Sequence, residues 1–422
     1  MSSLPLVDTL IQNAKIFNNG EPAVIEDIAI ADGKIVARGE NLDIEGAARV
    51  IDGSGKWLMP GFFDIHTHYD LELEVAPGLP ESVRHGTTSV VIANCSLGLA
   101  FGNQRSGEID PIVDCFARVE NLPKSLLRTC ADNVSWDSPK AYLEHLDQLN
   151  LGPNVVTMVP HSMLRIDAMG FNDSISRDPS EAELTTMQTN LGDALKLGYA
   201  GFSTDALPFH YLANHPNCEK KIPTQFAKYD ELKKLTQVVR EHDALWQATP
   251  PKDSAVDTIK TFLLTSGKLH KKPLRVTVVA ALDVANNWKI LKLAKVLAKV
   301  LNSKFVQGEF HLQALGAPFK VWSDGAITPL SEEIPELRKL NETDLEDRAA
   351  RLSILNDSDY IKTFRAMWLK GKQGWGLARL KRILNLEDYA FNRKLSDMTV
   401  EGCPIDHWVG MNMQNLLDRI IA

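Results

Sequence analysis

The sequence is poor in cysteine and in aromatic residues, and it lacks a long hydrophobic run. Cysteines account for 5 of the 422 residues, and 7% of the residues are aromatic. No two cysteines form a Cys-x-x-Cys pair, which argues against a disulfide framework or a four-cysteine zinc module. No stretch reaches the roughly 20 apolar residues of a membrane-spanning helix, and the first residues lack the basic and apolar regions of a signal peptide. We therefore expect a cytoplasmic protein with reduced thiols and no membrane partner.

Basic residues are outnumbered by acidic ones. The chain has 46 Lys and Arg residues against 54 Asp and Glu residues, which gives a net charge of −8. A negatively charged chain is a poor partner for nucleic acid or for an anionic membrane, so neither is expected to bind. Hydrophobic residues make up 44% of the 422 residues, which is enough for one large barrel or for two to three ordinary domains.

The first part of the chain is predicted to form a small β domain over residues 1–59. Short apolar stretches such as Asp27–Ile30 alternate there with turn residues. The Asp32-Gly33 pair between two alternating apolar stretches is a strong signal for a β-hairpin.

Polar residues begin abruptly at a His-x-His pattern. The turn Pro60-Gly61 leads into Phe62–His66, which is predicted to be a buried strand. Side chains two apart in a strand point to the same side, so His66 and His68 can reach one metal ion together. Neutral imidazole is the commonest nitrogen ligand of zinc and similar ions. The alternative interpretation is a pair of surface histidines that bind no metal.

After His68 the chain alternates apolar strands with amphipathic helices. One helix is predicted between an N-cap at Asp178 and Gly198, and another over Ile290–Leu301. Seven strands are predicted, at Phe62–His66, Thr88–Ala93, Val155–Pro160, Ala200–Thr204, Ala244–Ala248, Arg275–Ala281 and Phe305–Phe310. This alternation predicts an α/β fold with a parallel sheet, and the length fits a TIM-type (β/α)8 barrel over residues 60–330 that lacks an identifiable eighth strand. Residues 331–422 are predicted to form a helical, charged segment.

Several motifs in the first half of the chain resemble one family. Asp27–Ile35 followed by Met59–His68 resembles the amidohydrolase superfamily. The stretch His85–Gly98, with His-Gly-Thr-Thr-Ser and Asn-Cys-Ser-Leu-Gly, is similar to the D-aminoacylase branch of N-acyl-D-amino-acid deacylases. Pro160–Gly170 and Gly201–Thr204 resemble the same branch.

The resemblance implies a metal-dependent hydrolase of linear amide bonds on a TIM barrel, acting on small N-acyl amino acids. In such an enzyme a metal-activated water attacks the amide carbonyl, and zinc is the usual ion. His66 and His68 would be ligands after the first strand, and Cys95 takes the place of the family's cysteine ligand after the second. A thiolate at a strand's carboxyl end suits zinc chemically. The alternative for Cys95 is a small buried hydrophobe.

The resemblance also suggests residues for substrate binding. His161 and Arg165 follow a strand end and are candidates for contacting the substrate, although a structural hydrogen-bonding role fits His161 equally. Lys252 or Arg165 could replace the arginine that the family uses for the substrate's carboxylate. His210 and His215 lie in the loop after the fourth strand and are weaker candidates.

Two departures from the family pattern limit the expected site. The fifth strand has Gln247 where the family has a metal-binding histidine, and the sixth-strand stretch Val276–Asp283 has no histidine. We therefore expect one zinc ion rather than two. Asp324, in Ser323-Asp324-Gly325, is the candidate general base, although no second glycine follows it.

Two alternative functions stay open. The chain is expected to be truncated relative to the family, so it could be a catalytically impaired homologue or subunit, with a partner chain or a second copy covering the open barrel edge. The other alternative is a cyclic amidase of the dihydroorotase or hydantoinase type. Those enzymes use a carbamylated lysine, which Phe202-Ser203-Thr204 at the end of the fourth strand does not provide.

Overall fold

The structure is a computed structural model. It describes residues 6–18, 20–101, 110–251, 255–279, 282–315, 320–323, 329–344, 347–387, 389 and 394–421. The chain divides into two compact units, one formed by Met1–Phe63 with Ser82–Ser89 and the other by Asp64–Glu81 with Val90–Ala422. The division into domains at residues 59 and 330 stays a prediction.

The first unit contains a five-stranded sheet. Its strands are β1 (Thr9–Asn18), β2 (Glu21–Ala31), β3 (Lys34–Gly39), β4 (Arg49–Asp52) and β5 (Trp57–Leu58). The order is β3-β2-β1-β4, with β5 also paired to β1. β2 and β3 are antiparallel and joined by Asp32 and Gly33, whose φ angles are 48° and 70°. The small β domain and its predicted hairpin are therefore confirmed.

The remaining strands form two short sheets. They are β6 (Phe62–Asp64), β7 (Thr87–Ile92), β8 (Asn154–Thr157), β9 (Val159–Pro160), β10 (Gly201–Ser203), β11 (Leu245–Ala248), β12 (Arg275–Val278) and β13 (Glu309–Leu312). One sheet has the order β6-β7-β8 and the other β13-β12-β11-β10-β9. All neighbours from β9 to β13 are parallel, as predicted. Among the described residues, β13 is paired only with β12.

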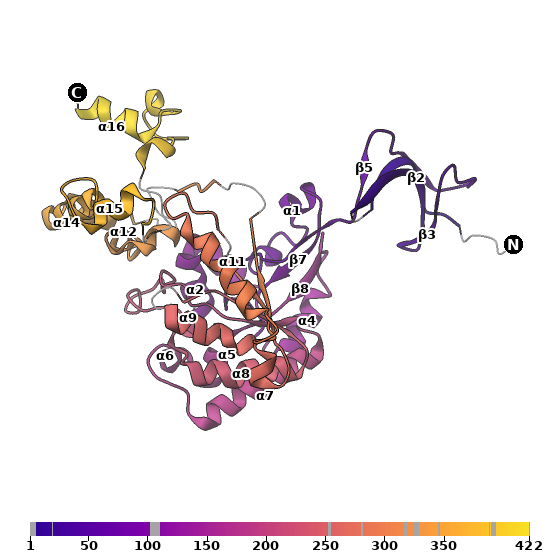
Figure 1. The fold of residues 1–422 in the computed structure, drawn as a ribbon, viewed down its shortest axis with the longest axis horizontal. Helices are drawn as coiled ribbons and strands as arrows, with labels where there is room; N and C mark the ends of the chain where they lie inside the picture. Colours follow the sequence, from indigo (N-terminus) through magenta and orange to yellow (C-terminus); the bar gives the residue numbers. More distant parts are fainter. Residues whose placement is uncertain are drawn as a thin grey trace. The chain divides into compact units, whose positions relative to one another are not determined.

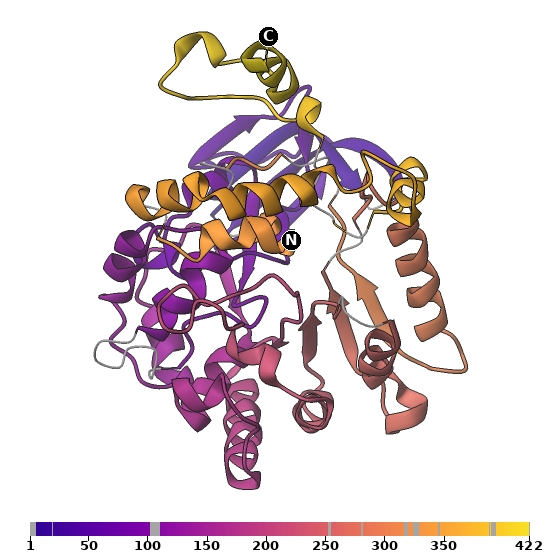
Figure 2. The same ribbon diagram turned by 90° about the vertical axis from the view of Figure 1, so that its left-hand side faces the viewer.

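Helices alternate with these strands along the chain (Figures 1 and 2). Their bounds are α1 (Pro80–Arg84), α2 (Pro111–Val119), α3 (Lys124–Ala131), α4 (Pro139–Leu146), α5 (His161–Met169), α6 (Phe171–Ser174), α7 (Glu181–Leu197), α8 (Tyr229–Glu241), α9 (Ala255–Phe262), α10 (Gly267–His270) and α11 (Lys289–Leu301). Short 3-10 helices are η1 (Glu72–Glu74), η2 (Pro223–Phe226) and η3 (Leu263–Thr265). Large side chains such as Trp246, Phe202 and Phe310 fill one core beneath them.

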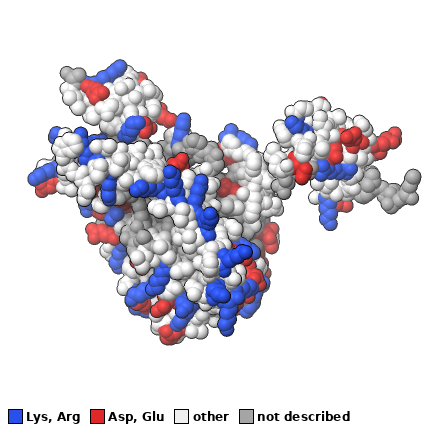
Figure 3. All heavy atoms as spheres, in the orientation of Figure 1, with Lys and Arg blue, Asp and Glu red and all other residues white. Residues whose placement is uncertain are grey.

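The two helices predicted from the sequence are present. The N-cap of α7 lies two residues after the predicted one, because Ser180 and not Asp178 accepts the hydrogen bond of the Glu183 N–H group in a capping box. Gly198 ends the helix with a φ of 111°. The lysines of α11 are exposed, as expected for an outer barrel helix, and basic and acidic side chains are interspersed on the face shown in Figure 3.

The predicted bounds of the strand Phe305–Phe310 are wrong. The strand is Glu309–Leu312, and Phe305 is 90% exposed. The residues before it form a turn, in which the Gly308 N–H group donates to the carbonyl of Leu301 (2.9 Å). Phe305 and Val306 are adjacent apolar residues, which in the sequence favour a strand. In the structure they lie in the turn that ends α11.

The chain after β13 is helical among the described residues. It comprises η4 (Pro329–Glu333), α12 (Pro335–Asn341), α13 (Arg348–Asn356), α14 (Ser358–Leu369), α15 (Leu377–Ile383), η5 (Leu395–Asp397), η6 (Asp406–Trp408) and α16 (Met413–Ile421). The part of the chain that the structure describes contains no helix with the length and hydropathy needed to span a membrane.

Candidate metal centre

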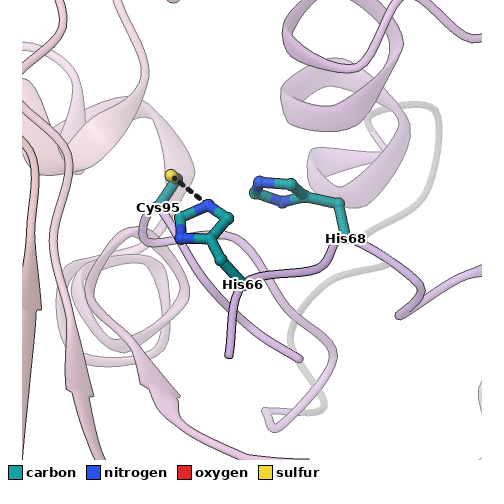
Figure 4. A group of neighbouring side chains, drawn as sticks. All are labelled: His66, His68 and Cys95. Atoms are coloured by element: carbon teal, nitrogen blue, oxygen red, sulfur yellow. Dashed lines mark hydrogen bonds between the residues drawn. The ribbon is translucent and has the colours of Figure 1, made fainter. Parts of the chain in front are cut away.

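The structure brings His66, His68 and Cys95 together. One nitrogen from each imidazole and the thiol sulfur all lie within 4.8 Å of one another. The Nε2 atom of His66 is 3.4 Å from the Cys95 Sγ atom (Figure 4). The two histidines follow β6 and the cysteine follows β7, so the three side chains meet beyond the ends of adjacent strands. The predicted ligand set therefore has the geometry of a single metal-binding cluster.

Thr67 fixes the backbone between the two histidines. Its N–H group donates to the carbonyl of Val91 (3.1 Å), and its hydroxyl donates to the same oxygen (2.7 Å). The side-chain amide of Asn94 donates to the Thr67 carbonyl (3.2 Å). Because these bonds tie Thr67 to the end of β7, the neighbouring imidazoles are held next to the loop that carries Cys95.

That loop has an unusual backbone. Ala93, Cys95 and Ser96 have φ angles of 60°, 49° and 68°, in the left-handed region that non-glycine residues rarely adopt. Each such residue costs on the order of 1–3 kcal/mol, and clusters of them are found mainly at functional sites. The conformation is held on one side by Asp70, whose carboxylate accepts the Ala93 N–H group (3.1 Å). On the other side Ser203, at the end of β10, accepts the Ser96 N–H group (3.2 Å).

Gln247 supplies the third support of the loop. Its Oε1 atom accepts the Cys95 N–H group (2.8 Å), and the residue is 0% exposed. The oxygen is thereby engaged with the backbone of the candidate ligand, while the Nε2 atom has no hydrogen-bond partner among the described residues. Gln247 thus positions the backbone of Cys95 in this structure.

A Gln247→Ala variant is expected to be destabilised by about 1–3 kcal/mol, because it leaves the buried Cys95 N–H group without an acceptor. The free energy of unfolding from urea titration measures the effect. Gln148→Ala is the matched control, since Gln148 is exposed and should change the stability by less than about 0.5 kcal/mol. Equal stability of the two variants would contradict the positioning role of Gln247.

The electrostatics of the cluster suit metal binding. The pKa of His66 is lowered to about 4, mainly by burial and to a smaller extent by the charge of His68. The pKa of His68 is likewise lowered to about 4, mainly by burial and to a smaller extent by the charge of His210. Both imidazoles are therefore neutral near pH 7 and have a lone pair available for a cation. Burial raises the pKa of the Cys95 thiol, so the proton must be displaced when a metal binds.

The donor set fits a zinc ion. Two imidazole nitrogens and one thiolate sulfur are the ligand types of tetrahedral zinc sites, and a three-residue set keeps a fourth position open. The Nδ1 atom of His66 is buried and has no hydrogen-bond partner among the described residues, which is unusual for a polar atom in a folded protein. Glu120 lies beside the cluster, with Oε1 3.3 Å from the His68 Nδ1 atom. A carboxylate beside a ligating histidine commonly orients the ring.

Three buried or partly buried polar residues were missed or ranked low from the sequence. Glu120 and Asp205 were not selected, and His210 was a weaker candidate. Asp205 lies two residues after β10, and its position just beyond a strand end is the signal that could have found it. Glu120 follows α2 and has no such signal, because only the tertiary fold brings it to His68.

His161 and Arg165 lie in a buried ion-pair network. Both are 0% exposed. The Nε2 atom of His161 is 2.9 Å from Glu231 Oε1, and its Nδ1 atom is 2.9 Å from the hydroxyl of Thr224. The guanidinium of Arg165 pairs with the other oxygen of Glu231 and donates to the carbonyl of Ser174 (3.2 Å). This geometry matches the structural alternative, and neither side chain has exposed surface through which a substrate could contact it.

The other predicted site residues fall elsewhere. Asp324 and Lys252 lie outside the described residues, so their roles stay predictions. His215 is exposed, and its Nδ1 atom lies 3.3 Å from the sulfur of Cys218 rather than in the cluster.

Comparisons with known proteins place these observations in context. No family model matches the chain. An uncharacterised protein of Mycobacterium tuberculosis is 32% identical over 420 residues, which are 98% of this chain and 65% of that protein. An N-acyl-D-aspartate deacylase of Alcaligenes xylosoxydans xylosoxydans is 30% identical over 249 residues, which are 59% of this chain and 44% of the deacylase.

A solved structure supports the same relationship. The crystal structure of an N-acyl-D-glutamate deacylase of Bordetella bronchiseptica, complexed with zinc and a phosphonate mimic of the tetrahedral intermediate, is 25% identical with a TM-score of 0.56. The match covers 74% of this chain and 59% of that enzyme. The chain therefore spans less than two thirds of the length of these relatives. The likeness confirms the predicted TIM-barrel class of the fold.

Proposed function

We propose that the chain is a metal-dependent hydrolase of linear amide bonds in small N-acyl amino acids, of the amidohydrolase superfamily, because it is similar to N-acyl-D-amino-acid deacylases. The observation that carries this proposal is the cluster of His66, His68 and Cys95, whose ligand atoms lie within 4.8 Å of one another. The relatives include deacylases, and the cluster supplies the donor types that zinc requires.

We propose one zinc ion, held by these three side chains. A bound zinc ion would lower the pKa of a water molecule to about 7 and polarise the amide carbonyl. The imidazoles of His66 and His68 and the thiol of Cys95 would hold the ion, and the Glu120 carboxylate lies 3.3 Å from the His68 Nδ1 atom. A second ion of the family kind is not supported, since Gln247 directs its amide oxygen to the Cys95 N–H group.

Other aspects of the function stay proposals. Asp324 is the proposed general base and Lys252 a proposed contact for the substrate's carboxylate. The proposed location is the cytoplasm, and it is supported by all five cysteines being free thiols in the structure. A second chain at the edge of β13 is the proposed partner, because β13 pairs only with β12 among the described residues and an open sheet edge is a site of association.

The purified chain, loaded with one equivalent of zinc, is expected to release free amine from N-acetyl-D-amino acids. A turnover number on the order of 1–10³ s⁻¹ is typical of enzymes. A fluorescent amine assay over a panel of acidic and neutral N-acetyl-amino acids of both configurations measures it. Dialysis against a chelator should remove the activity, and zinc should restore it.

The same experiment separates the alternatives. Zinc binding without turnover on any substrate of the panel would identify a catalytically impaired homologue. Turnover on a hydantoin or dihydroorotate, but not on linear amides, would identify a cyclic amidase. Undiminished turnover after complete removal of the metal would reject metal-dependent hydrolysis.

A further inference from the structure

The loop that carries Cys95 packs against the start of α5. A side-chain carbon at Gly98 would lie only 2.6 Å from the Cβ atom of Ala93 and 3.1 Å from the Cγ atom of Pro160, so glycine is required there. Pro160 is the residue before α5. The loop of residues 93–98 therefore closes on itself and lies next to the first turn of that helix.

Two hydrogen bonds join this loop to Ser162, which lies in the first turn of α5. The Ser162 N–H group donates to the carbonyl of Ser96 (3.1 Å). The hydroxyls of Ser96 and Ser162 form a hydrogen bond with each other (2.9 Å), and both residues are 0% exposed. Because Ser96 directly follows Cys95, Ser162 holds the backbone next to the candidate ligand.

Ser162 is itself held by a third segment. The N–H group of Thr224, in η2, donates to the Ser162 hydroxyl (3.2 Å). The Thr224 hydroxyl lies 2.9 Å from the Nδ1 atom of His161, the residue before Ser162. Since His161 also pairs with Glu231, the first turn of α5 is anchored in the buried ion-pair network. The Ser162 hydroxyl therefore has a fixed position from which it can hold the loop.

The backbone that Ser162 holds is strained. Ala93, Cys95 and Ser96 adopt the left-handed conformation, and such strain persists only where the surrounding contacts determine the backbone. Loss of one contact should therefore let Ser96 and Cys95 relax toward other conformations. The Cys95 sulfur would then leave its position 3.4 Å from the Nε2 atom of His66 (Figure 4).

We propose that Ser162 is a positioning residue for the metal site. Through its two hydrogen bonds to Ser96 it holds Cys95 where the thiolate can bind a divalent cation together with His66 and His68. The proposal rests on the proposed metal site and deepens it, because it makes the affinity for the ion depend on a residue of α5. Ser162 acts through Ser96 and is not itself a ligand.

Cobalt(II) binding tests the proposal without any substrate. Cobalt(II) accepts imidazole and thiolate ligands as zinc does, and its bond to a thiolate gives a charge-transfer absorption band. Titration of the metal-free chain with cobalt(II) alone therefore measures the affinity and the coordination of the cysteine together.

A Ser162→Ala variant removes the hydroxyl bond to Ser96 and the acceptor of the Thr224 N–H group. Residues that orient metal ligands from outside the ligand set typically contribute about 10–100-fold to metal affinity. The dissociation constant of cobalt(II) should therefore rise by about 10–100-fold in Ser162→Ala.

Ser174→Ala is the matched control. Ser174 is also 0% exposed, and its hydroxyl donates to the carbonyl of Phe171 (2.6 Å) rather than to the loop. Both substitutions remove a buried hydroxyl and should lower the free energy of unfolding, but only Ser162→Ala should weaken cobalt(II) binding. The comparison separates positioning of the ligand from a general loss of stability.

A Ser96→Ala variant removes the same hydroxyl bond from the side of the loop, and it also serves if Ser162→Ala does not fold. It should weaken cobalt(II) binding as well. If the two hydroxyls act through each other, the double variant Ser96→Ala/Ser162→Ala should bind cobalt(II) no more weakly than the weaker of the two single variants.

Three results would overturn the proposal. They are an unchanged cobalt(II) affinity in Ser162→Ala or in Ser96→Ala, an equal loss of affinity in Ser174→Ala, and additive losses in the double variant. Failure of the unaltered chain to bind cobalt(II), or an unchanged charge-transfer band in Cys95→Ala, would instead reject the proposed metal site, so the two failures are distinguishable.

Discussion

A His66→Ala/His68→Ala variant is expected to lose its metal. Zinc binds peptide sites of four ligands with about 10–16 kcal/mol, or roughly 3 kcal/mol for each ligand. Removing two of the three protein ligands should therefore weaken binding on the order of 10⁴-fold, since every 1.4 kcal/mol is a factor of ten. Metal analysis after gel filtration should show about one zinc ion per unaltered chain and less than about one-tenth per variant chain. Hydrolysis should be lost in parallel.

The control for this experiment removes two exposed histidines elsewhere. His242 and His407 are exposed, so a His242→Ala/His407→Ala variant should keep the full metal content. An unaltered chain without zinc, or equal zinc in both double variants, would show that the cluster is not a metal site.

The second large effect is expected at the buried ion-pair network. Glu231 is 4% exposed and holds both His161 and Arg165, which are 0% exposed. A Glu231→Gln variant removes the negative charge and leaves the guanidinium of Arg165 buried without a counter-ion. Breaking a buried pair in this way costs about 3–5 kcal/mol. The free energy of unfolding from urea titration, checked for two-state behaviour with two spectroscopic probes, measures the loss.

An exposed pair provides the matched control. Lys228 and Asp178 form an ion pair with side chains 75% and 49% exposed. Asp178→Asn should change the stability by less than about 1 kcal/mol, because water screens such a pair. If Glu231→Gln were no more destabilising than Asp178→Asn, the network would not stabilise the fold.

The same network gives the stability a dependence on pH. Burial raises the pKa of Glu231, but His161 and Arg165 outweigh burial and hold the pKa below its ordinary value of 4.5. A carboxylate with a lowered pKa in the folded state stabilises the fold above the unfolded pKa. That contribution is lost as the pH falls through the folded pKa, so acid unfolding should begin below about pH 4.5.

The sequence predicted those parts of the molecule that depend on local patterns. The hairpin at Asp32-Gly33 follows from the conformational preferences of two residues, and the helix ending at Gly198 follows from its caps. His66 and His68 were predicted as a pair from alternation along a buried strand Phe62–His66, but β6 ends at Asp64 and its Phe62 and Phe63 are 59% and 56% exposed, so the histidines lie just after the strand. Cys95 was selected from resemblance to the family, and the structure brings the three side chains together. In each case the information lies within a few neighbouring residues.

The parts that were missed depend on contacts between distant segments. Glu120 reaches His68 only through the packing of α2, and no periodicity in the sequence marks it. Arg165 is basic and follows a strand end, as a substrate-binding residue would, and its burial depends on Glu231, 66 residues away. The sequence alone does not distinguish a buried ion pair from a pair of residues open to substrate.

The left-handed backbone at residues 93, 95 and 96 has a consequence for directed evolution. Ala93, Cys95 and Ser96 all occupy conformations that glycine adopts without strain. A selection for heat resistance alone would favour glycine at position 93, where it relieves the strain without removing a side-chain hydrogen bond; at position 96 it would remove the buried bond between the Ser96 and Ser162 hydroxyls (2.9 Å). The replacement would also widen the range of conformations open to the neighbouring Cys95. A thermostable lineage obtained in this way would drift away from metal retention unless metal binding were selected at the same time.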